Sequence, residues 1–422
     1  MTHHRAVPLF LKLASCAEAD RVLERFAPPG GLEEVPLEGA LGRVIARPFT
    51  ATEPMPAWPR ARMDGFAVRA ADTHGASDAL PAYLKVAATV AMGEDASRLP
   101  RLTEGECAAI STGGMMMPGA DAVLMVELTA PAGEGQIEAR RPVGEGEHVQ
   151  LIGEDLKPGT LLLEQGTLIG APEVAALAMA GVDPVSVHRR PRVVIFSTGD
   201  ELVDHKRVPP PGRVRDSNSL AMAAQVRSAG GDPVIGNRIS DEAEDLRRGV
   251  TSALDEGADI VLVSGGSSVG TRDVTAEVLG GLEGDGILLH GINIRPGKPT
   301  IIADGGGRPC LGMPGYPVSS MVVFHRFVRP LIWRLAGRRP PPELWPIRRT
   351  AQLAAAIHSR GGREDYVRVT LEDSGDGELP EATPLLGGSA ALTSLLHADG
   401  VVVLEAGCEG LPAGTQVEVL GL

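Results

Sequence analysis

Glycines and hydroxyls that could bind an anion follow an apolar run past the middle of the chain. The stretch SGGSSVG (264–270) comes directly after DIVLV, and glycine lets backbone N–H groups approach a negatively charged ligand. Gly265 and Gly270 have the spacing of a nucleoside triphosphate loop, but Thr271 and Arg272 stand where that loop needs Lys and Ser or Thr. We therefore expect a phosphate-bearing ligand of another kind, with a tight turn that binds nothing as the alternative. The candidate binding residues are Gly265, Gly266, Ser267 and Ser268.

Two further loops carry groups that suit an oxyanion. RPGKP places Arg295 and Lys298 on a backbone stiffened by prolines, and its glycine permits a sharp turn between the two cations. GMPGYPVSS adds Pro314 and Ser319 at the start of a predicted helix. Because two cations on one rigid loop can bind phosphate, we predict that all four residues contact the substrate. The alternative is a pair of solvated turns and a simple helix cap.

Acidic side chains follow the same apolar runs, and they indicate a metal. Glu201 in STGDEL, Asp241 in ISDEAED and Asp273 in GTRD all come at or near the ends of predicted strands. So many carboxylates would repel an anionic ligand unless a divalent cation lay between them, and oxygen ligands favour Mg²⁺. We therefore predict a magnesium-assisted phosphate site in which Glu201, Asp241 and Asp273 bind the metal. Taken singly, each acid could instead cap a helix or carry solvated charge.

The first half of the chain offers three weaker candidates. Asp64 lies in the turn of RMDGFAV, Thr112 lies beside glycines in ISTGG, and Asp155 lies in the polar turn GEDLKPGT. From the residues alone, a turn without function is the default for each.

The pattern of elements explains why the loops of the second half should meet. From about residue 192, short apolar runs such as RVVIFS alternate with helical stretches such as LAMAAQVRSAGG. Strands that alternate with helices form a mostly parallel sheet with helices on both faces, and ligands bind beyond the carboxyl ends of its strands. We expect a doubly wound α/β domain over residues 184–337, with the candidate loops at its strand ends.

Other regions are predicted around this domain. The proline-rich stretch GRRPPPELWP precedes short strand patterns that indicate a β-domain or barrel over residues 343–422. Residues 50–146 carry several β-like runs and are expected to form an inserted β-domain. Residues 1–49 and 147–183 are left as an N-terminal region.

Composition and charge exclude several classes of protein. The formal net charge of −14 argues against duplex nucleic acid as a partner. The chain has no apolar run of the roughly 18 residues that a membrane span needs, and its N-terminus lacks the apolar core of a signal peptide. We therefore expect a cytoplasmic protein that does not bind membranes. The four cysteines form no CxxC pair and the histidines no HExxH, which favours reduced, packed thiols and no metal held by histidine or cysteine.

Five arginines close together in the sequence have two interpretations. They could form a patch for something acidic, but we favour the interpretation that they solvate a proline-rich interdomain hinge. They are Arg334, Arg338, Arg339, Arg348 and Arg349.

Taken in order, the motifs resemble those of the MoeA (gephyrin E-domain) family. The resemblance runs from PMPAWPRARMDGFAV through STGGMMMPGADAVLMVE, GEDLKPGT, RRPRVVIFSTGDELV, SGGSSVGTRD, RPGKP and GMPGYPVS to REDYVRVTL and SAALTSLLHADG, which is nearly the whole chain. It implies a multidomain α/β plus β protein with a molybdopterin-binding doubly wound α/β domain, an elongated, lasso-like N-terminal dimerisation region, an inserted β-domain and a C-terminal β-barrel. It also implies a homodimer whose active site lies between subunits.

The resemblance implies an enzyme, a molybdopterin molybdenumtransferase of molybdenum cofactor biosynthesis. Such an enzyme inserts molybdenum from molybdate into the dithiolene of adenylylated molybdopterin. It cleaves the phosphoanhydride with Mg²⁺ present and releases AMP. Besides these substrates and a second copy of the chain, the implied partners are a molybdopterin adenylyltransferase and apo-molybdoenzymes.

Roles of single residues carry over from the resemblance. Asp64, Thr112 and Asp155 match positions in the family's catalytic cleft, and Glu201, Asp241 and Asp273 match acids that handle metal and phosphate. Ser267 and Ser268 match the loop that cradles the ligand, and Arg295 and Lys298 match the cationic loop. Arg368 and Ser389 match residues that help to hold molybdate.

Departures from the family pattern keep alternatives open. Ser267 replaces a frequent valine, Gly291 stands where some members have lysine, and Gln150 stands where arginine is common. A paralogue that uses tungstate is one alternative, and a non-catalytic carrier or scaffold for molybdopterin is another. The acids at Glu201, Asp241 and Asp273 favour catalysis over the carrier. The long N-terminal region and the C-terminal β-domain argue against a third alternative, the adenylylating enzyme of the same pathway.

Overall fold

The structure is a computed structural model, and it describes the chain in six segments. These cover residues 13–26, 31–265, 273–339, 348–375, 378–385 and 387–421. The chain folds into two compact units, and each is described by itself. Unit 1 comprises Met1–Arg47, Gln165–Val174 and Asp183–Leu422, and unit 2 comprises Pro48–Glu164 and Ala175–Val182.

A mixed six-stranded sheet forms the centre of unit 1. Its strand order is β16-β13-β17-β21-β20-β18, in which the first four strands are parallel and β20 pairs antiparallel with both β21 and β18. The middle strands consist almost entirely of buried apolar residues, as expected for a sheet covered on both faces. The strands are β16 (Asp232–Ile235), β13 (Arg192–Ser197), β17 (Ile260–Ser264), β21 (Pro309–Met313), β20 (Ile301–Asp304) and β18 (Gly286–His290).

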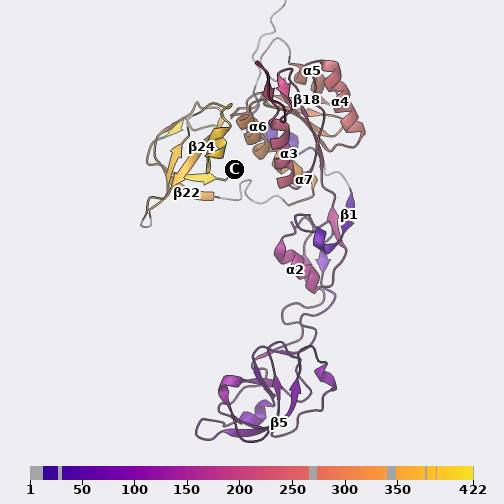
Figure 1. Ribbon diagram of the computed structural model, residues 1–422, viewed down its shortest axis with the longest axis vertical. Helices are drawn as coiled ribbons and strands as arrows, with labels where there is room; N and C mark the ends of the chain where they lie inside the picture. Colours follow the sequence, from indigo (N-terminus) through magenta and orange to yellow (C-terminus); the bar gives the residue numbers. More distant parts are fainter. Residues whose placement is uncertain are drawn as a thin grey trace, which may run out of the picture. The chain divides into compact units, whose positions relative to one another are not determined.

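Helices cover both faces of this sheet, and Figure 1 shows α4 and α5 on one side of it and α3, α6 and α7 on the other. Alternate residues of β13 face opposite layers: Val193 and Ile195 pack with α3 and α7, whereas Val194 and Phe196 pack with α4 and α5. The doubly wound α/β domain predicted from the sequence is therefore confirmed. The helices are α1 (Cys16–Leu23), α3 (Asn218–Ser228), α4 (Ala243–Asp255), α5 (Val274–Gly280), α6 (Pro317–Val323) and α7 (Arg329–Leu335).

The long apolar helix at the end of this domain is not regular. Between α6 and α7 the residues Phe324–Val328 form a π-helical turn. Pro330 follows this turn, and because proline has no N–H it cannot donate the α-helical hydrogen bond to the carbonyl of Arg326. The helical residues nevertheless run without a break from Pro317 to Leu335.

The C-terminal part of unit 1 is a closed five-stranded β-barrel, which confirms the predicted fold. Its strands run in the order β24-β25-β22-β28-β26, and the pairing of β26 with β24 closes the ring. One short strand of the α/β domain, β19 (Ile294–Arg295), pairs in parallel with β24. The barrel strands are β22 (Arg348–Leu353), β24 (Glu364–Glu372), β25 (Glu381–Pro384), β26 (Gly400–Leu404) and β28 (Gln416–Leu420).

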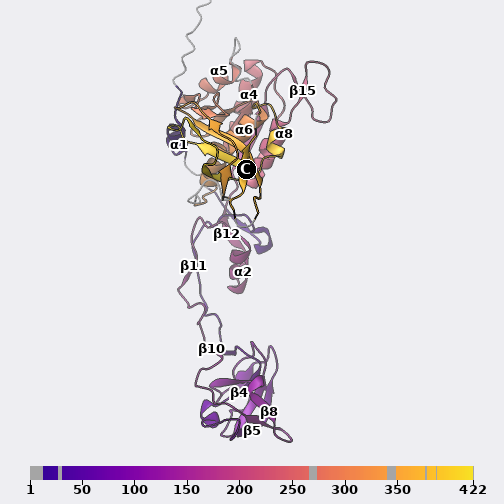
Figure 2. The ribbon, with the colours of Figure 1, turned by 90° about the vertical axis from the view of Figure 1, so that its left-hand side faces the viewer.

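Unit 2 contains a second six-stranded sheet, whose strands β4, β5 and β8 gather in one module in Figure 2. Its order is β7-β4-β6-β5-β9-β8, and separate apolar clusters pack on its two faces. The strands are β4 (Gly65–Val68), β5 (Ala82–Val90), β6 (Glu106–Ile110), β7 (Ala122–Met125), β8 (Thr129–Pro131) and β9 (Gln136–Ala139).

Short elements complete both units. In unit 1, β1 pairs antiparallel with β12, and in unit 2 β2 pairs with β11 and β3 with β10. Their bounds, with those of the remaining short elements, are β1 (Leu32–Val35), β12 (Val185–His188), β2 (Phe49–Thr50), β11 (Leu161–Leu163), β3 (Arg60–Ala61), β10 (Val149–Gln150), α2 (Ala171–Met179), β14 (Leu202–Val203), β15 (Val214–Arg215), β23 (Ile357–His358), β27 (Gly410–Leu411) and α8 (Thr393–Leu396).

Candidate functional site

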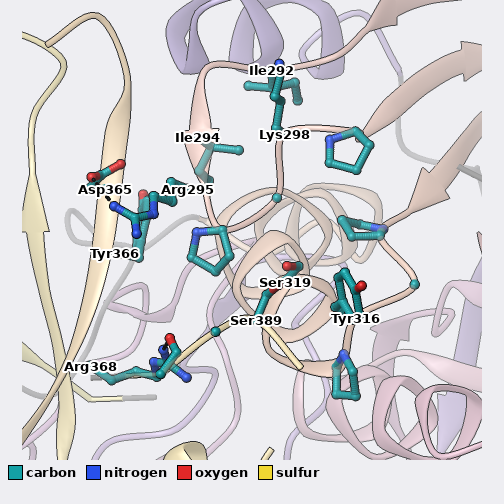
Figure 3. A pocket seen from close by; sticks show the side chains of 18 of the residues that line it. Ile292, Ile294, Arg295, Lys298, Tyr316, Ser319, Asp365, Tyr366, Arg368 and Ser389 are labelled. Carbon is teal, nitrogen blue, oxygen red and sulfur yellow. Dashed lines mark hydrogen bonds and ion pairs between the residues drawn. The ribbon is translucent and has the colours of Figure 1, made fainter. Parts of the chain in front are cut away.

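Unit 1 contains a cavity of ≈1410 Å³ between the carboxyl ends of its parallel strands and the barrel. Figure 3 shows the side chains that point into it from both parts. Its volume exceeds the roughly 300–1,000 Å³ of a typical small-molecule pocket, so it can take a ligand built of several chemical parts. The sequence-predicted residues that line it are Glu201, Gly265, Arg295, Lys298, Pro314, Ser319, Arg368 and Ser389.

The RPGKP loop supplies two cations to this cavity. Its start is fixed because β19 pairs with β24, which brings the Arg295 guanidinium within 3.5 Å of a carboxylate oxygen of Asp365. Gly297 has φ +130°, and a Cβ there would lie 2.5 Å from Val323, so the sharp turn requires glycine. Within the described part of the chain, Lys298 has no carboxylate within 4 Å. Its ammonium group is therefore available to an anionic ligand.

The barrel supplies a third cation, Arg368. Its side chain is 8% exposed, and it donates 2.7 Å to the carbonyl of Gly387 and also hydrogen-bonds Ser394. Burial lowers the pKa of Arg368, and the positive charge of Arg295 lowers it further. Two guanidinium groups that repel each other across a cavity favour an anion between them. Ser389 lies on the same rim, where its carbonyl accepts from the N–H of Val318.

Asn218 joins three of the loops and has no counterpart among the predicted site residues. Its amide donates 2.9 Å to the hydroxyl of Ser264 and 2.8 Å to the carbonyl of Gly315, so it connects the ends of β17 and β21. Gly265 lies at the same place with φ +107°, where a Cβ would come within 2.1 Å of the Thr198 carbonyl oxygen. The loops therefore approach one another at backbone level, which is how such loops expose N–H groups to anions. Gly266, Ser267 and Ser268 lie outside the described residues.

The three predicted metal ligands are at one edge of the sheet but do not form a cluster. Glu201 is exposed and lines the cavity. Asp241 accepts 2.8 Å from the hydroxyl of Thr198 and 3.3 Å from the N–H of Asp200. Asp273 caps α5 through the N–H of Ala276 and lies 3.4 Å from His290. Among the described residues, no group of three His, Cys, Asp or Glu side chains is placed to hold a metal.

This donor set still fits one kind of magnesium site. Mg²⁺ usually keeps several waters and is bound through one or two carboxylates together with substrate phosphates. Thr198 links Asp241 to the end of β13, the strand whose loop also carries Glu201. These two acids therefore suit a metal whose remaining ligands come from the substrate. Asp273 uses one carboxylate oxygen, Oδ1, in its helix cap and stays a third candidate.

The three candidates from the first half of the chain belong to unit 2. Asp64 accepts from the N–H of Thr112 at 2.7 Å and from its hydroxyl at 2.9 Å. The backbone hydrogen bond of Thr112, followed by that of its side chain, lowers the pKa of Asp64. Asp155 is fixed by its backbone N–H, which donates to the carbonyl of Met55 at 3.0 Å. The structure thus brings Asp64 and Thr112 together as a hydrogen-bonded pair that favours the carboxylate form of Asp64.

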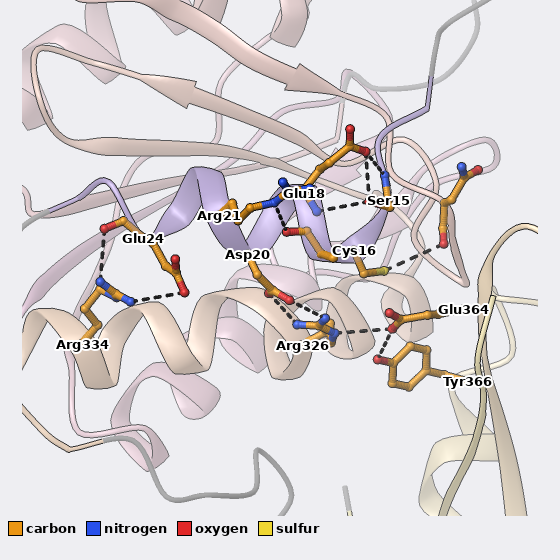
Figure 4. Close-up of polar contacts among 12 residues, drawn as sticks. Ser15, Cys16, Glu18, Asp20, Arg21, Glu24, Arg326, Arg334, Glu364 and Tyr366 are labelled. Atoms are coloured by element: carbon orange, nitrogen blue, oxygen red, sulfur yellow. Dashed lines mark hydrogen bonds and ion pairs between the residues drawn. The ribbon is translucent and has the colours of Figure 1, made fainter. Parts of the chain in front are cut away.

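A buried polar network supports the barrel wall of the cavity (Figure 4). Tyr366 lines the cavity and donates 2.9 Å to Glu364, which lies 3.5 Å from Arg326 in the π-helical turn. Arg326 also makes two hydrogen bonds of 2.7 Å to Asp20 of α1. Burial alone would lower the pKa of Arg326, but the hydrogen bonds to Asp20 and the nearby acidic groups outweigh it, so the net shift is upward. Burial raises the pKa of Tyr366, with Glu364 adding to the effect.

Comparison with known proteins gives a consistent answer along the whole chain. Family models match residues 14–181 as "MoeA N-terminal region (domain I and II)", 194–334 as "Probable molybdopterin binding domain" and 350–422 as "MoeA C-terminal region (domain IV)". A molybdopterin molybdenumtransferase from Nostoc sp. is 36% identical over 399 residues, which is 92% of this chain and 88% of the relative. The protein of the same name from Bacillus subtilis is 33% identical and covers 96% of this chain and 93% of its own length.

This chain belongs to the MoeA family. A solved MoeA protein of molybdopterin biosynthesis from Pyrococcus horikoshii aligns with a TM-score of 0.80 at 36% identity, over 97% of this chain and 99% of the other. A second structure from that organism gives a TM-score of 0.84 at 28% identity. The predicted family, its fold and the prediction that the protein is an enzyme are confirmed. Among the described residues of this MoeA protein, no helix has the length and apolar character needed to cross a membrane.

Proposed function

We propose that this MoeA protein inserts molybdenum from molybdate into the dithiolene of adenylylated molybdopterin, with cleavage of the phosphoanhydride and release of AMP. The observation that carries the proposal is the single cavity into which Arg295, Lys298 and Arg368 converge from two domains. Its curated relatives carry the name molybdopterin molybdenumtransferase. A chain with a net charge of −14 needs such local cations to bind two anionic substrates.

The cavity offers different chemistry at its two ends. On the α/β side, Lys298, Asn218 and the backbone around Gly265 suit a phosphoanhydride, because they combine a point charge with amide donors. On the barrel side, Arg368 and Ser389 suit a tetrahedral oxyanion such as molybdate. We propose that the nucleotide end of the substrate binds at the first group and the oxyanion at the second.

Mg²⁺ is part of the proposal, with Glu201 and Asp241 as its nearest protein ligands and Asp273 as the third candidate. Bound beside the phosphates, the ion would neutralise negative charge that develops when the phosphoanhydride breaks. The side chains of the cavity then have the task of orientation. Lys298 and Arg295 fix the phosphate end, and Asn218 keeps the loops at a constant separation.

We further propose that the protein acts as a homodimer in which unit 2 of one subunit completes the site of the other. Asp64 and Thr112 form a hydrogen-bonded pair in unit 2, whereas the cavity belongs to unit 1. The resemblance to the MoeA family, which implies an active site between subunits, supports a role for Asp64, Thr112 and Asp155 in catalysis through a second copy. The donor of the substrate and the acceptor of the product would be a molybdopterin adenylyltransferase and apo-molybdoenzymes.

The test is AMP release by the purified protein supplied with adenylylated molybdopterin, molybdate and Mg²⁺. We expect release in the wild type and at least tenfold slower release by Asp273→Asn, because asparagine caps a helix as well as aspartate does and only the charge is lost. Asp245→Asn on the exposed face of α4 is the matched control and should leave the rate unchanged. Tight binding of the substrate by the wild type without AMP release would support the carrier alternative instead. Faster turnover with tungstate than with molybdate would identify a tungstate-using paralogue.

A further inference from the structure

A second cavity of unit 1 is lined by arginines. It has a volume of ≈180 Å³ and lies between the N-terminal segment and the ends of α3 and α7. Five arginines line it, together with one histidine and one tryptophan. They are Arg43, Arg189, Arg190, Arg227, Arg338, His188 and Trp333.

Two of these five guanidinium groups have carboxylate partners. Arg43 donates 2.7 Å to Glu33, and Arg189 makes two hydrogen bonds, of 2.9 and 2.8 Å, to Asp259. Both arginines are therefore explained by the fold itself. Their pairing neutralises their charge, so the net positive charge of the cavity comes from the other three arginines.

The remaining three arginines have no acidic partner among the residues that the structure describes. Within the described ranges, no carboxylate lies within 4 Å of Arg190, Arg227 or Arg338. Arg338 instead lies 4.4 Å from the ring centre of the buried Trp333, and burial lowers its pKa. The carbonyl ends of α3 and α7 can offset only part of this charge, because a helix C-terminus is equivalent to about half a negative charge. Even with both helix ends counted, about two positive charges are left over.

A buried polar atom in the same wall also lacks a partner. Nε2 of His188 is inaccessible to solvent and has no hydrogen bond within the described part of the chain. The ring packs on Gly337, where an added Cβ would lie 2.6 Å from Nε2. Burial lowers the pKa of His188, so the ring is held neutral beside the arginines.

We infer that this cavity binds a small tetrahedral oxyanion of the phosphate type. Such an ion carries the negative charge that would balance the three arginines. Guanidinium groups also match its oxygens in geometry. A single water needs only about 10–15 Å³ of such space, so a cavity of ≈180 Å³ readily admits phosphate or molybdate. The lining comes from the N-terminal segment (Gly42, Val44) and from the α/β domain (Arg227, Trp333), so the ion would link these two parts.

The arginines of the sequence cluster do not act together in this site. Arg334 turns to Glu24 of α1, at 3.9 Å, whereas Arg338 joins arginines from distant parts of the chain. The inference does not rest on the proposed catalytic function, because the two cavities share no lining residue.

The test measures binding of radiolabelled inorganic phosphate by equilibrium dialysis in the Arg295→Gln/Lys298→Gln protein, which has a weakened substrate cavity. We expect one phosphate per chain to remain bound, and the further change Arg227→Gln/Arg338→Gln to weaken it at least tenfold. The matched control is Arg247→Gln/Arg248→Gln, two arginines of α4 that each pair with an acid of their own helix. It removes the same charge and should have no effect. Competition by unlabelled molybdate against phosphate then shows which ion the site prefers.

A second measurement keeps every arginine of the site in place. In the Trp58→Phe/Trp345→Phe protein, Trp333 is the single tryptophan of the chain. Phosphate that draws Arg338 away from the indole ring should shift its fluorescence with the same dissociation constant as the dialysis gives. The inference is overturned if the Arg227→Gln/Arg338→Gln protein binds phosphate like the control. A Trp333 emission that stays constant at saturating phosphate would overturn it as well.

Discussion

Replacement of Arg326 should open the junction of α1, the π-helical turn and the barrel. The guanidinium group is 10% exposed and makes two hydrogen bonds of 2.7 Å to Asp20 and a contact of 3.5 Å to Glu364. Removing one partner of a buried ion pair costs about 3–5 kcal/mol, because the other charge is left without compensation. Asp20 is 41% exposed and can take up water, so we expect the lower end of that range, about 3 kcal/mol.

The matched control lies in α7, which directly follows the π-helical turn. Arg334 contacts Glu24 of α1 at 3.9 Å, and both side chains are largely exposed (Figure 4). A pair of this kind contributes about 0–1 kcal/mol. Arg334→Met removes the same charge and a similar side-chain volume from the same continuous run of helical residues. The two variants therefore differ mainly in how deeply the lost ion pair is buried.

Hydrogen exchange measured by mass spectrometry is a suitable assay, because it reports local opening in a protein of several domains. A loss of about 3 kcal/mol corresponds to roughly a hundredfold loss of amide protection over α1 and β24 in Arg326→Met. Arg334→Met should change protection there by no more than about fivefold. Equal losses of amide protection in the two variants would refute the reasoning, because burial of the ion pair would then make no difference to its contribution.

Three further predictions follow from single groups. Burial lowers the pKa of His325 to about 4. Below pH 6.5 the unfolded chain therefore takes up a proton that the folded chain does not. The free energy of unfolding should consequently fall by about 2 kcal/mol between pH 7 and pH 5. His325→Gln should lose this part of the acid sensitivity in urea titrations, and an unchanged pH slope would count against a buried neutral ring. Burial raises the pKa of Cys107 and of Cys310 to about 12, and it also raises the pKa of Cys16. An aromatic disulfide reagent should therefore label Cys408 first in the folded protein and all four thiols in denaturant. Early labelling of Cys310 would contradict this order. Lys298→Met should weaken binding of AMP by about tenfold to a hundredfold, the range for a lost charge-assisted hydrogen bond, and calorimetry that finds no change would remove Lys298 from the phosphate site.

Much of the α/β domain is predictable from the sequence because its strands are short, apolar and separated by helices. Parallel strands place their carboxyl ends at one edge, so the loops with Glu201, Gly265 and Pro314 had to meet. The C-terminal β-domain was recognisable from its strand and turn pattern. Its closure into a ring depends on the pairing of β26 with β24, which joins residues about 35 apart in the sequence and leaves no local signal.

The part of the site that the sequence did not reveal depends on contacts between domains. Asp365 and Tyr366 reach the cavity only because β24 pairs with β19, and Asn218 connects strand ends that lie far apart in the chain. The acidic residues were singled out from the sequence, but their role was not, because their spacing fits a metal site and a helix cap equally well. Asp273 caps α5, whereas Asp241 holds Thr198 and does not cap α4. Such local roles were the alternative interpretation of these residues.

The most direct test of the proposed site is a crystal of the protein soaked with molybdate and AMP and measured at the molybdenum absorption edge. The account predicts an anomalous peak within hydrogen-bond distance of Arg368 and Ser389, with the phosphate of AMP beside Lys298. A molybdenum peak elsewhere with that corner of the large cavity empty would contradict it.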